Sequence, residues 1–271
     1  MKPPVSIREL ASVILPRDAN PRVLALLRAY LDESYSPQRM LIAGFIGSDV
    51  EWEKVGGLWA EALAKRDAPY FHACELNMQL GPFKRWETWR CDALKKACAE
   101  VLAESSLDEI SAGFTGDWSE ITRQCPGIAN RFPNPYAFVF DLAVAQMQRA
   151  GRKWYAGDMV ACVFDSKDDH EKRAHDIFES QRGANGLWAN IQSVTYGDDK
   201  KQIELQCADM LANELLNAPR RGAENLPLLS TIHKRGRRAS LRRQWDETLI
   251  RIYERDPDLT EIFYPPEPLD R

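Results

Sequence analysis

Short apolar runs and helical periodicities alternate along the chain and predict most of its elements. Apolar runs at 26–34 and 40–48 flank the turn residues SYSPQ, so we expect two adjacent strands in an antiparallel hairpin. From Asp49 onward the apolar positions recur every three or four residues, which predicts a helix over 50–66. The same spacing predicts a second helix over 84–105.

The rest of the sequence continues this alternation of strand and helix patterns. The elements expected there are a strand at 108–116, a loop rich in Gly, Pro and Asn at 125–135, a helix at 136–153, a strand at 159–169, a polar helix at about 170–181, a weak strand at 189–197 and a helix at about 202–216. Strands separated by helices indicate an α/β fold, with a mixed sheet of about five strands flanked by helices.

The length of 271 residues allows one large domain or two small ones, and one large core buries surface more efficiently. We therefore expect a single domain over 22–255, with a helical extension starting at about 220. The charged, proline-containing residues 1–21 are expected to form an N-terminal arm, and the proline-rich acidic residues 256–271 an extended tail.

Composition narrows the class of protein. Lys and Arg total 36 and Asp and Glu total 40, so the formal net charge is −4 and no global positive field attracts a polyanion. No apolar stretch approaches the roughly 18 residues of a membrane span, and the N-terminus lacks a signal peptide's apolar region. The six cysteines include no CxxC pair, and the four histidines lack zinc-site spacing. We therefore expect a cytoplasmic protein with free thiols and no membrane contact.

Two of the predicted strands end in an aspartate. Asp32 follows the first apolar run and Asp165 follows the strand at 159–169, and sites in α/β sheets form at the carboxyl ends of strands. Each aspartate could instead be an ordinary turn or cap residue. Strand alternation gives Asp32 and Asp165 definite sheet faces and turns Glu33 to the opposite one.

The late helix carries a polar stripe. Gln202, Gln206, Asp209 and Asn213 are spaced by four, three and four residues, which places them on one helix face. Apolar neighbours flank Asp209, so this carboxylate would lie at the edge of the interior, where ionisation is costly without a cation. The alternative is a solvated helix face that contains one acid.

Three aspartates at one point would raise one another's pKa unless a divalent cation lay between them. Carboxylate oxygens suit Mg²⁺ or Mn²⁺ rather than zinc. Two such ions roughly 3.5 to 4 Å apart can activate water for phosphodiester cleavage, which is the chemistry that we expect.

The motifs LDES, FHACEL, FDSK and KKQIELQCADMLANEL together resemble the bacterial family called domain of unknown function 3800, over roughly residues 25–220. Members commonly have a glycine after Asp-Glu-Ser, where this chain has Tyr35. The resemblance implies a ribonuclease-H-like fold in which acids on the first strand, a fourth-position strand and a late helix bind two metal ions. The matching residues are Asp32, Asp165 and Asp209.

A fourth acid is expected in such a site. Glu75 is the candidate because FHACEL itself resembles the family pattern, and His72 could serve as a ligand or proton carrier. Alternatively, His72 caps or packs locally and Glu75 begins a turn. Lys167, Lys200 and Lys201 could each hold a phosphate oxygen or simply be solvated.

A basic segment lies near the C-terminus, in HKRGRRASLRRQW. Its candidate nucleic-acid contacts are Lys234, Arg235, Arg237, Arg238, Arg242 and Arg243. Such residues can neutralise backbone phosphates, and Trp245 could stack on a base of RNA or DNA. A charge run of this kind is more often a solvated helix face.

Two function hypotheses follow. The first is a metal-dependent nuclease or related phosphodiester hydrolase whose ligands are Asp32, Asp165, Asp209 and Glu75. The second is a non-catalytic module that binds nucleic acid or another partner on a ribonuclease-H-like scaffold. The first is preferred because the three aspartates lie on elements that can meet at one sheet edge, although a fold alone does not establish activity.

Overall fold

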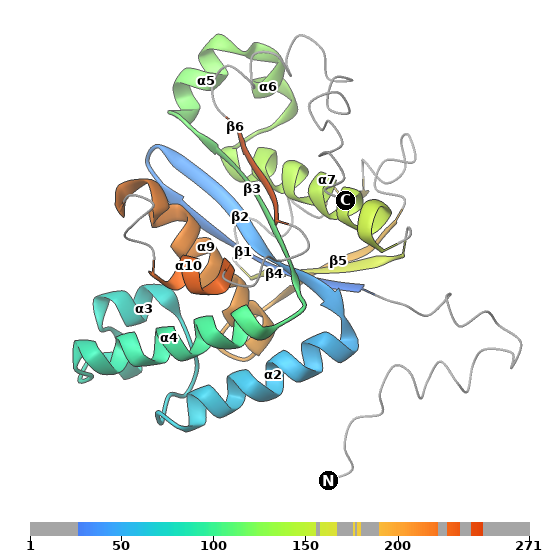
Figure 1. Cartoon of the computed structure of the whole chain (residues 1–271). Coiled ribbons are helices and arrows are strands. Elements are labelled where there is room, and N and C mark those ends of the chain that lie inside the picture. Colours follow the sequence, from blue (N-terminus) through green and yellow to red (C-terminus); the bar gives the residue numbers. More distant parts are fainter. Residues whose placement is uncertain are drawn as a thin grey trace, which may run out of the picture.

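A six-stranded mixed sheet organises the protein, as seen in a computed structural model (Figure 1). The residues that the structure describes are 27–155, 158–166, 176, 178–179, 190–221, 227–233 and 240–245. The strands are β1 (Leu27–Ser36), β2 (Arg39–Ser48), β3 (Asp108–Thr115), β4 (Val160–Asp165), β5 (Ile191–Gly197) and β6 (Ser240–Trp245). Their order across the sheet is β5-β4-β1-β2-β3-β6.

The sheet combines antiparallel and parallel pairs. β1 and β2 form the predicted antiparallel hairpin, and β3 continues it antiparallel to β2. β4 lies parallel to β1, β5 parallel to β4, and β6 parallel to β3. The expected mixed sheet is therefore confirmed, with one described strand more than the five expected.

Helices cover both faces of this sheet (Figure 1). One face carries α2 (Asp49–Ala64), α3 (Ala73–Met78), the short 3-10 turn η2 (Gly81–Phe83), α4 (Thr88–Glu104), α9 (Ile203–Arg221) and α10 (Pro227–His233). The other face carries α5 (Trp118–Gln124), α6 (Pro126–Arg131) and α7 (Pro135–Trp154). Each face has its own hydrophobic core, which gives the layered α/β architecture predicted from the sequence.

Side chains in β1 and β4 alternate between the two cores. Leu31 and Phe164 pack in the core on the α7 side, whereas Tyr30 and Val163 pack in the core on the α9 side. Successive strand residues point to opposite faces. The parity of each strand position therefore decides which helices its side chain meets.

Local sequence signals account for where several helices begin. Ser48 and Glu51 form a capping box at the start of α2, with the Ser48 backbone N–H donating to Glu51 Oε2 at 2.8 Å. Asn134 caps α7 by accepting a hydrogen bond from the Ala137 backbone N–H at 2.8 Å, and Pro135 occupies the first turn. These caps stabilise helix ends that would otherwise leave backbone donors unsatisfied.

The structure differs from the sequence-based prediction in two segments between residues 84 and 135, and a third prediction is left untested. The segment 125–135, expected to be a loop, contains α6, because a proline at the start of a helix needs no backbone partner. The helix expected over 84–105 begins only at Thr88, after η2. The predicted polar helix at 170–181 lies almost entirely outside the described residues.

The C-terminal extension is also only partly helical. α10 is the expected helical portion, but 240–245 form β6 on the edge of the sheet. Pairing with β3 satisfies the backbone groups of an otherwise open edge, so the strand forms in spite of the charge pattern. α10 is anchored by a hydrogen bond between His233 Nε2 and the buried Glu109 Oε2 at 2.7 Å.

The described residues bear on two predictions, the absence of a membrane-spanning helix and the presence of free thiols. No described helix is both long and apolar enough to cross a membrane. All six cysteines lie in the described ranges, where none forms a disulfide, and five of them are buried.

The buried carboxyl of Asp141 on α7 gives a prediction about pH. Burial raises its pKa to about 6, although Arg131, with its Nη2 3.9 Å from Asp141 Oδ1, lowers it in part. The folded protein thus binds this proton more tightly than the unfolded chain, where the ordinary value is 3.8. The stability that it contributes is fully present below pH 3.8 and is lost as the pH rises through about 6.

We expect Asp141→Asn to raise the free energy of unfolding at pH 7.5 by about 1 to 3 kcal/mol and to leave it nearly unchanged at pH 4. Urea unfolding at both pH values would measure this difference. Asp92→Asn, on the exposed surface of α4, is the matched control and should show no such pH-dependent gain. An equal effect of Asp141→Asn at both pH values would contradict the prediction.

Candidate functional site

Asp32 and Asp165 lie side by side at the carboxyl ends of two parallel strands. The β1–β4 register pairs Leu31 with Phe164, so the next residue on each strand is an aspartate. Both have the parity of the strand positions that face α9, and neighbouring strands are about 4.8 Å apart. The structure therefore brings the two strand-end aspartates together, on the sheet face that α9 covers.

α9 presents its polar stripe to the segment around α3. Gln206 Oε1 accepts hydrogen bonds from Trp59 Nε1 at 3.1 Å and from the Phe71 backbone N–H at 3.0 Å. Asp209 Oδ2 accepts from the Ala73 backbone N–H at 2.6 Å, and both stripe residues are buried. The stripe is thus a docking face within the protein rather than a solvated one.

The loop after β5 contributes an acid that the sequence analysis missed. The Asp199 backbone N–H donates to Asp165 Oδ1 at 3.3 Å, and its carbonyl accepts from Gln206 Nε2 at 2.9 Å. Its buried carboxylate lies 3.6 Å from His72 Nε2. Asp199 follows the end of a parallel strand in YGDDKK, the same signal that identified Asp32 and Asp165.

His72, Asp199 and Asp209 form the closest group of possible metal ligands among the described residues. One ligand atom of each lies within 4.8 Å of the other two. Asp165 adjoins this group because its Oδ1 accepts a hydrogen bond from the Asp199 backbone N–H, and Asp32 lies beside Asp165 on the neighbouring strand. Neither aspartate belongs to the group whose ligand atoms lie within 4.8 Å of one another. We refer to the four aspartates together with His72 as the acidic site.

The hydrogen bonds of His72 define its role. It caps α3, because the Glu75 backbone N–H donates to His72 Nδ1 at 3.2 Å. A nitrogen that accepts this bond carries no proton, so the proton of the ring lies on Nε2, which faces Asp199. A histidine that ligates a metal through one ring nitrogen usually donates a hydrogen bond from the other. His72 Nδ1 cannot donate a hydrogen bond without losing the cap of α3. His72 therefore fits a hydrogen-bond donor to a bound substrate better than a metal ligand or a proton carrier.

Glu75 is turned toward two other partners. Its Oε2 accepts from the Tyr70 hydroxyl at 2.7 Å, and its Oε1 pairs with Lys200 Nζ at 2.8 Å. Burial raises the pKa of Glu75, but the hydrogen bonds from Lys200 and Tyr70 outweigh it and hold the pKa below its usual value. Both carboxylate oxygens are thus engaged outside the closest ligand group, so the geometry favours Asp199 over Glu75 as the fourth acid.

The other predicted cations have varied positions. Lys200 binds Glu75 as described, and Lys201 pairs with Asp198 at 2.6 Å. The remaining predicted contacts cannot be placed as side chains: Lys167, Lys234, Arg235, Arg237 and Arg238 lie outside the described residues, and Arg242 and Arg243 are described only as backbone positions of β6.

Burial makes the negative charge of the acidic site costly. Asp32, Asp199 and Asp209 are all buried. Burial raises the pKa of Asp199, although the nearby His72 and Lys200 lower it in part. A divalent cation would offset this unfavourable charge, and carboxylate oxygens are the donors that Mg²⁺ and Mn²⁺ prefer. The aspartates therefore fit such an ion, whereas His72 in its capping tautomer does not.

Tyr136 of α7 lies on the opposite side of the sheet. Burial raises the pKa of the Tyr136 hydroxyl, and the charges of Glu33 and Asp32 raise it further, which shows that this phenol lies near the first strand's acids. Tyr136 also lines a cavity of about 250 Å³ with Phe114 and Trp118. Glu33 has the parity of the α7 face, as predicted, and so lies outside the acidic site.

Comparisons with known proteins add no assignment. No protein-family model matches the chain, and no curated protein sequence does so either. The relation to the domain of unknown function 3800 family therefore remains a prediction from the quoted motifs.

Proposed function

We propose that this protein is a divalent-metal-dependent phosphodiester hydrolase that cuts nucleic acid and has a ribonuclease-H-like fold. The observation that carries the proposal is the adjacency of Asp32 and Asp165 on the sheet face covered by α9, with Asp199 and Asp209 next to them. Buried carboxylates brought together from distant parts of a chain are costly without a cation.

The arrangement of the elements supports the fold part of this proposal. The family resemblance implies acids on the first strand, on a fourth-position strand and on a late helix. Asp32 lies on β1, Asp165 on β4 and Asp209 on α9. The elements that carry these three residues agree with those that the resemblance implies, which supports this part of the proposal.

Backbone N–H groups orient the carboxylates of the acidic site, and His72 presents an N–H beside them. The backbone N–H groups of Ala73 and Asp199 donate to one carboxylate oxygen of Asp209 and of Asp165 respectively, and these bonds orient the two carboxylates. His72 presents its Nε2–H beside Asp199, where it can donate a hydrogen bond to an oxygen of a bound phosphodiester. A bound Mg²⁺ or Mn²⁺ pair would lower the pKa of an attacking water and neutralise phosphate charge.

Calorimetric titration with Mn²⁺ tests the metal site. We expect specific uptake by the natural chain and at least about tenfold weaker binding by Asp209→Asn, since an asparagine keeps an acceptor for Ala73 but loses the charge. Glu75→Gln is the matched control, and its Mn²⁺ affinity should stay close to that of the natural chain. Absence of specific Mn²⁺ uptake would overturn the proposal and favour the non-catalytic module.

A second prediction separates a hydrogen-bond donor from a metal ligand at His72. We expect His72→Asn to lower kcat about 100-fold, because it removes the Nε2–H donor while an asparagine can still cap α3. Its Mn²⁺ affinity should change less than about threefold, because His72 is not expected to ligate the ion. Loss of Mn²⁺ binding together with activity would instead identify His72 as a metal ligand.

A further inference from the structure

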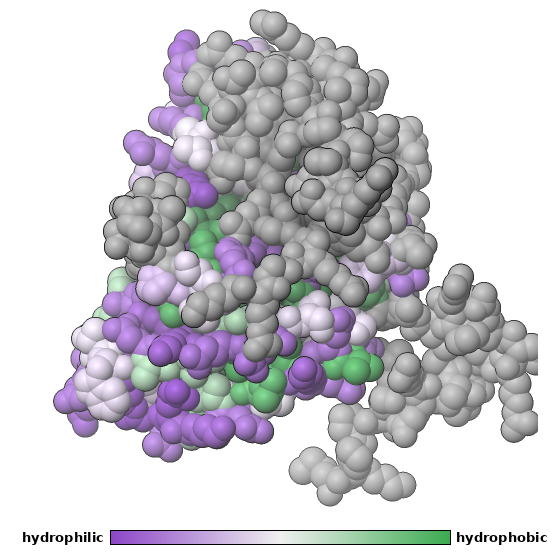
Figure 2. Space-filling view, viewed as in Figure 1, coloured by the Kyte–Doolittle hydropathy of each residue, from purple (hydrophilic) through white to green (hydrophobic). Residues whose placement is uncertain are grey.

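Exposed apolar side chains gather between α3 and the start of α4. Met78 is 56% exposed, Leu80 45% and Trp89 66%. They are three of the six large hydrophobic side chains that are exposed among the described residues. Hydrophilic residues dominate the visible surface of the α2–α4 layer (Figure 2), so an exposed indole here is unusual and indicates a contact surface.

The same stretch is basic within an acidic protein. Residues 84–96 contain five Lys or Arg and two acids, which gives 5 − 2 = +3, whereas the whole chain carries −4. Lys84 and Arg85 are exposed, and the described residues provide no ion-pair partner for either side chain. The surface therefore favours an anionic partner, and its tryptophans favour one that contains planar rings.

The aromatic part of this surface is held in place. The Arg90 guanidinium lies 3.8 Å from the centroid of the Trp86 ring, and Trp86 packs edge-on against the buried Phe83 at 5.0 Å. The Trp86 carbonyl accepts from Gln79 Nε2 at 2.6 Å. Trp89 Nε1 also donates to a carboxylate oxygen of Glu87. A surface ordered before binding loses little entropy when it meets its partner.

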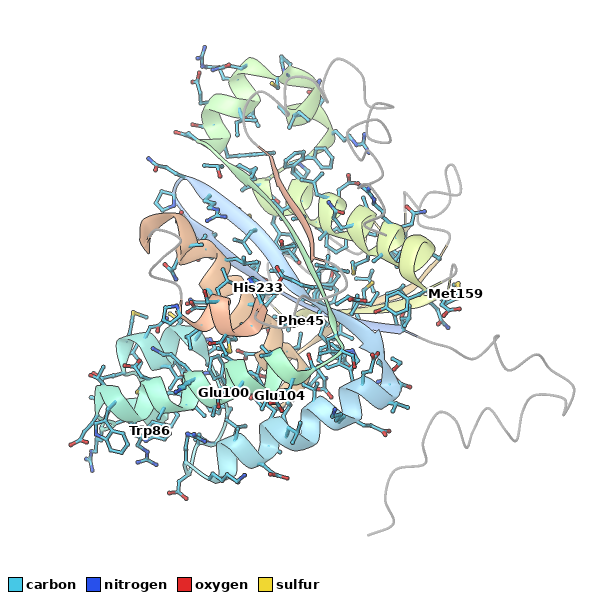
Figure 3. All side chains as sticks on the ribbon, viewed as in Figure 1. Phe45, Trp86, Glu100, Glu104, Met159 and His233 are labelled. Atoms are coloured by element: carbon cyan, nitrogen blue, oxygen red, sulfur yellow. The ribbon has the colours of Figure 1, made fainter. Side chains whose placement is uncertain are left out.

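A chain of contacts connects this surface with the acidic site. Phe83 packs edge-on against Tyr70 at 5.8 Å, and the Tyr70 hydroxyl binds Glu75. Lys200 Nζ lies 5.3 Å from the centroid of the Tyr70 ring. Lys200 directly follows Asp199 in the sequence. Figure 3 shows Trp86 at the outer end of α4, the end at which α3 also lies. The surface and the acidic site are therefore connected through the packed interior, by way of Phe83 and Tyr70.

We propose that Met78, Leu80, Lys84, Arg85, Trp86 and Trp89 form a platform that binds single-stranded nucleic acid. Lys84 and Arg85 contact backbone phosphates, and a base stacks on the exposed Trp89 ring. Bases within a duplex are already stacked on each other, so the platform selects an unpaired strand. This inference rests on the proposed function, because the bound strand is the polymer that the acidic site would cut.

Binding is measured on the full chain carrying Asp165→Asn, in EDTA, so that no strand is cleaved. The probes are a fluorescein-labelled twelve-nucleotide oligouridylate and the corresponding oligothymidylate, followed by anisotropy between 50 and 200 mM NaCl. Adding Trp89→Ala should weaken binding about tenfold. Adding Lys84→Gln with Arg85→Gln should weaken it further and reduce the slope of log affinity against log salt by about 1.4.

Two matched controls accompany these variants. Lys54→Gln with Lys65→Gln removes two exposed charges from α2 and its C-cap and should leave the affinity within about twofold. Arg237→Gln with Arg238→Gln tests the basic segment that the sequence analysis selected. The platform proposal is overturned if Trp89→Ala has no effect, if the α2 control loses as much affinity as the platform variants, or if only the variant at 237 and 238 loses affinity. It is also overturned if polyglutamate displaces the oligonucleotide equally from protein with and without Trp89.

Failure of this inference can be distinguished from failure of the proposed function. The proposed function is tested separately by hydrolysis of bis(p-nitrophenyl) phosphate with Mn²⁺ by the natural chain, which needs no stacked base. Hydrolysis without platform-dependent binding would overturn the platform alone. Platform-dependent binding without hydrolysis would support the platform and overturn the enzyme.

Discussion

Asp165→Asn is expected to lower Mn²⁺-dependent kcat/KM for phosphodiester hydrolysis by at least about 100-fold. Asp165 follows Phe164, the last residue of β4 that pairs with β1, and lies beside Asp32. Its Oδ1 accepts a hydrogen bond from the Asp199 backbone N–H. Asparagine has nearly the same size and keeps an acceptor for that N–H, so the substitution removes negative charge with little change in packing. The measurement is cleavage of unstructured RNA, single-stranded DNA, an RNA–DNA hybrid and a chromogenic diester.

Glu53→Gln is the control for Asp165→Asn. Glu53 lies on the exposed surface of α2, and its neutralisation should leave the rate within about twofold. Urea unfolding should show that both variants remain folded. If Asp165→Asn keeps full activity on a diester that the natural chain cuts with Mn²⁺, the acidic site is not the centre of hydrolysis.

Gly44→Ala is expected to lower the free energy of unfolding by about 3 kcal/mol or more, enough to leave much of the chain unfolded. Gly44 lies in β2 opposite Leu31 of β1. A Cβ at this position would lie 1.8 Å from the Tyr30 carbonyl oxygen and 2.9 Å from Leu31 Cα. Because these are backbone atoms of the central strand, they can move only if β1 and β2 separate.

Gly57→Ala is the matched control for this substitution. Gly57 is exposed on α2, and a Cβ built there meets nothing within 4 Å. Alanine in a helix interior restricts the unfolded chain, so we expect a gain of about 0.5 to 1 kcal/mol. Urea and thermal unfolding of both variants would measure the contrast, and equal stability of the two would contradict the packing argument at Gly44.

The local pattern of the sequence was sufficient for most of the regular elements. The hairpin of β1 and β2 and the helices α2, α7 and α9 follow from apolar spacing and cap residues that act within a few positions. Strand alternation also predicted that Asp32 and Glu33 point to opposite faces of the sheet, because the side-chain period of a strand is two.

Other features depended on partners that are distant in sequence. β6 forms where β3 offers an open edge, which the run of charges could not indicate. Asp199 enters the acidic site because β5 pairs with β4 and Gln206 holds the following loop. Glu75, selected from a motif, is drawn to Tyr70 and Lys200 instead.

The amino-acid sequence by itself determined the alternation of strands and helices, the faces of the strand acids and the polar stripe of α9. These properties depend on neighbours within one or two turns or strand positions, whose geometry is nearly constant. Only the tertiary structure decided which acids meet and which nitrogen of His72 carries a proton. Strand register, helix docking and the α3 cap set those relations, and each depends on atoms whose positions are known only after the chain has folded.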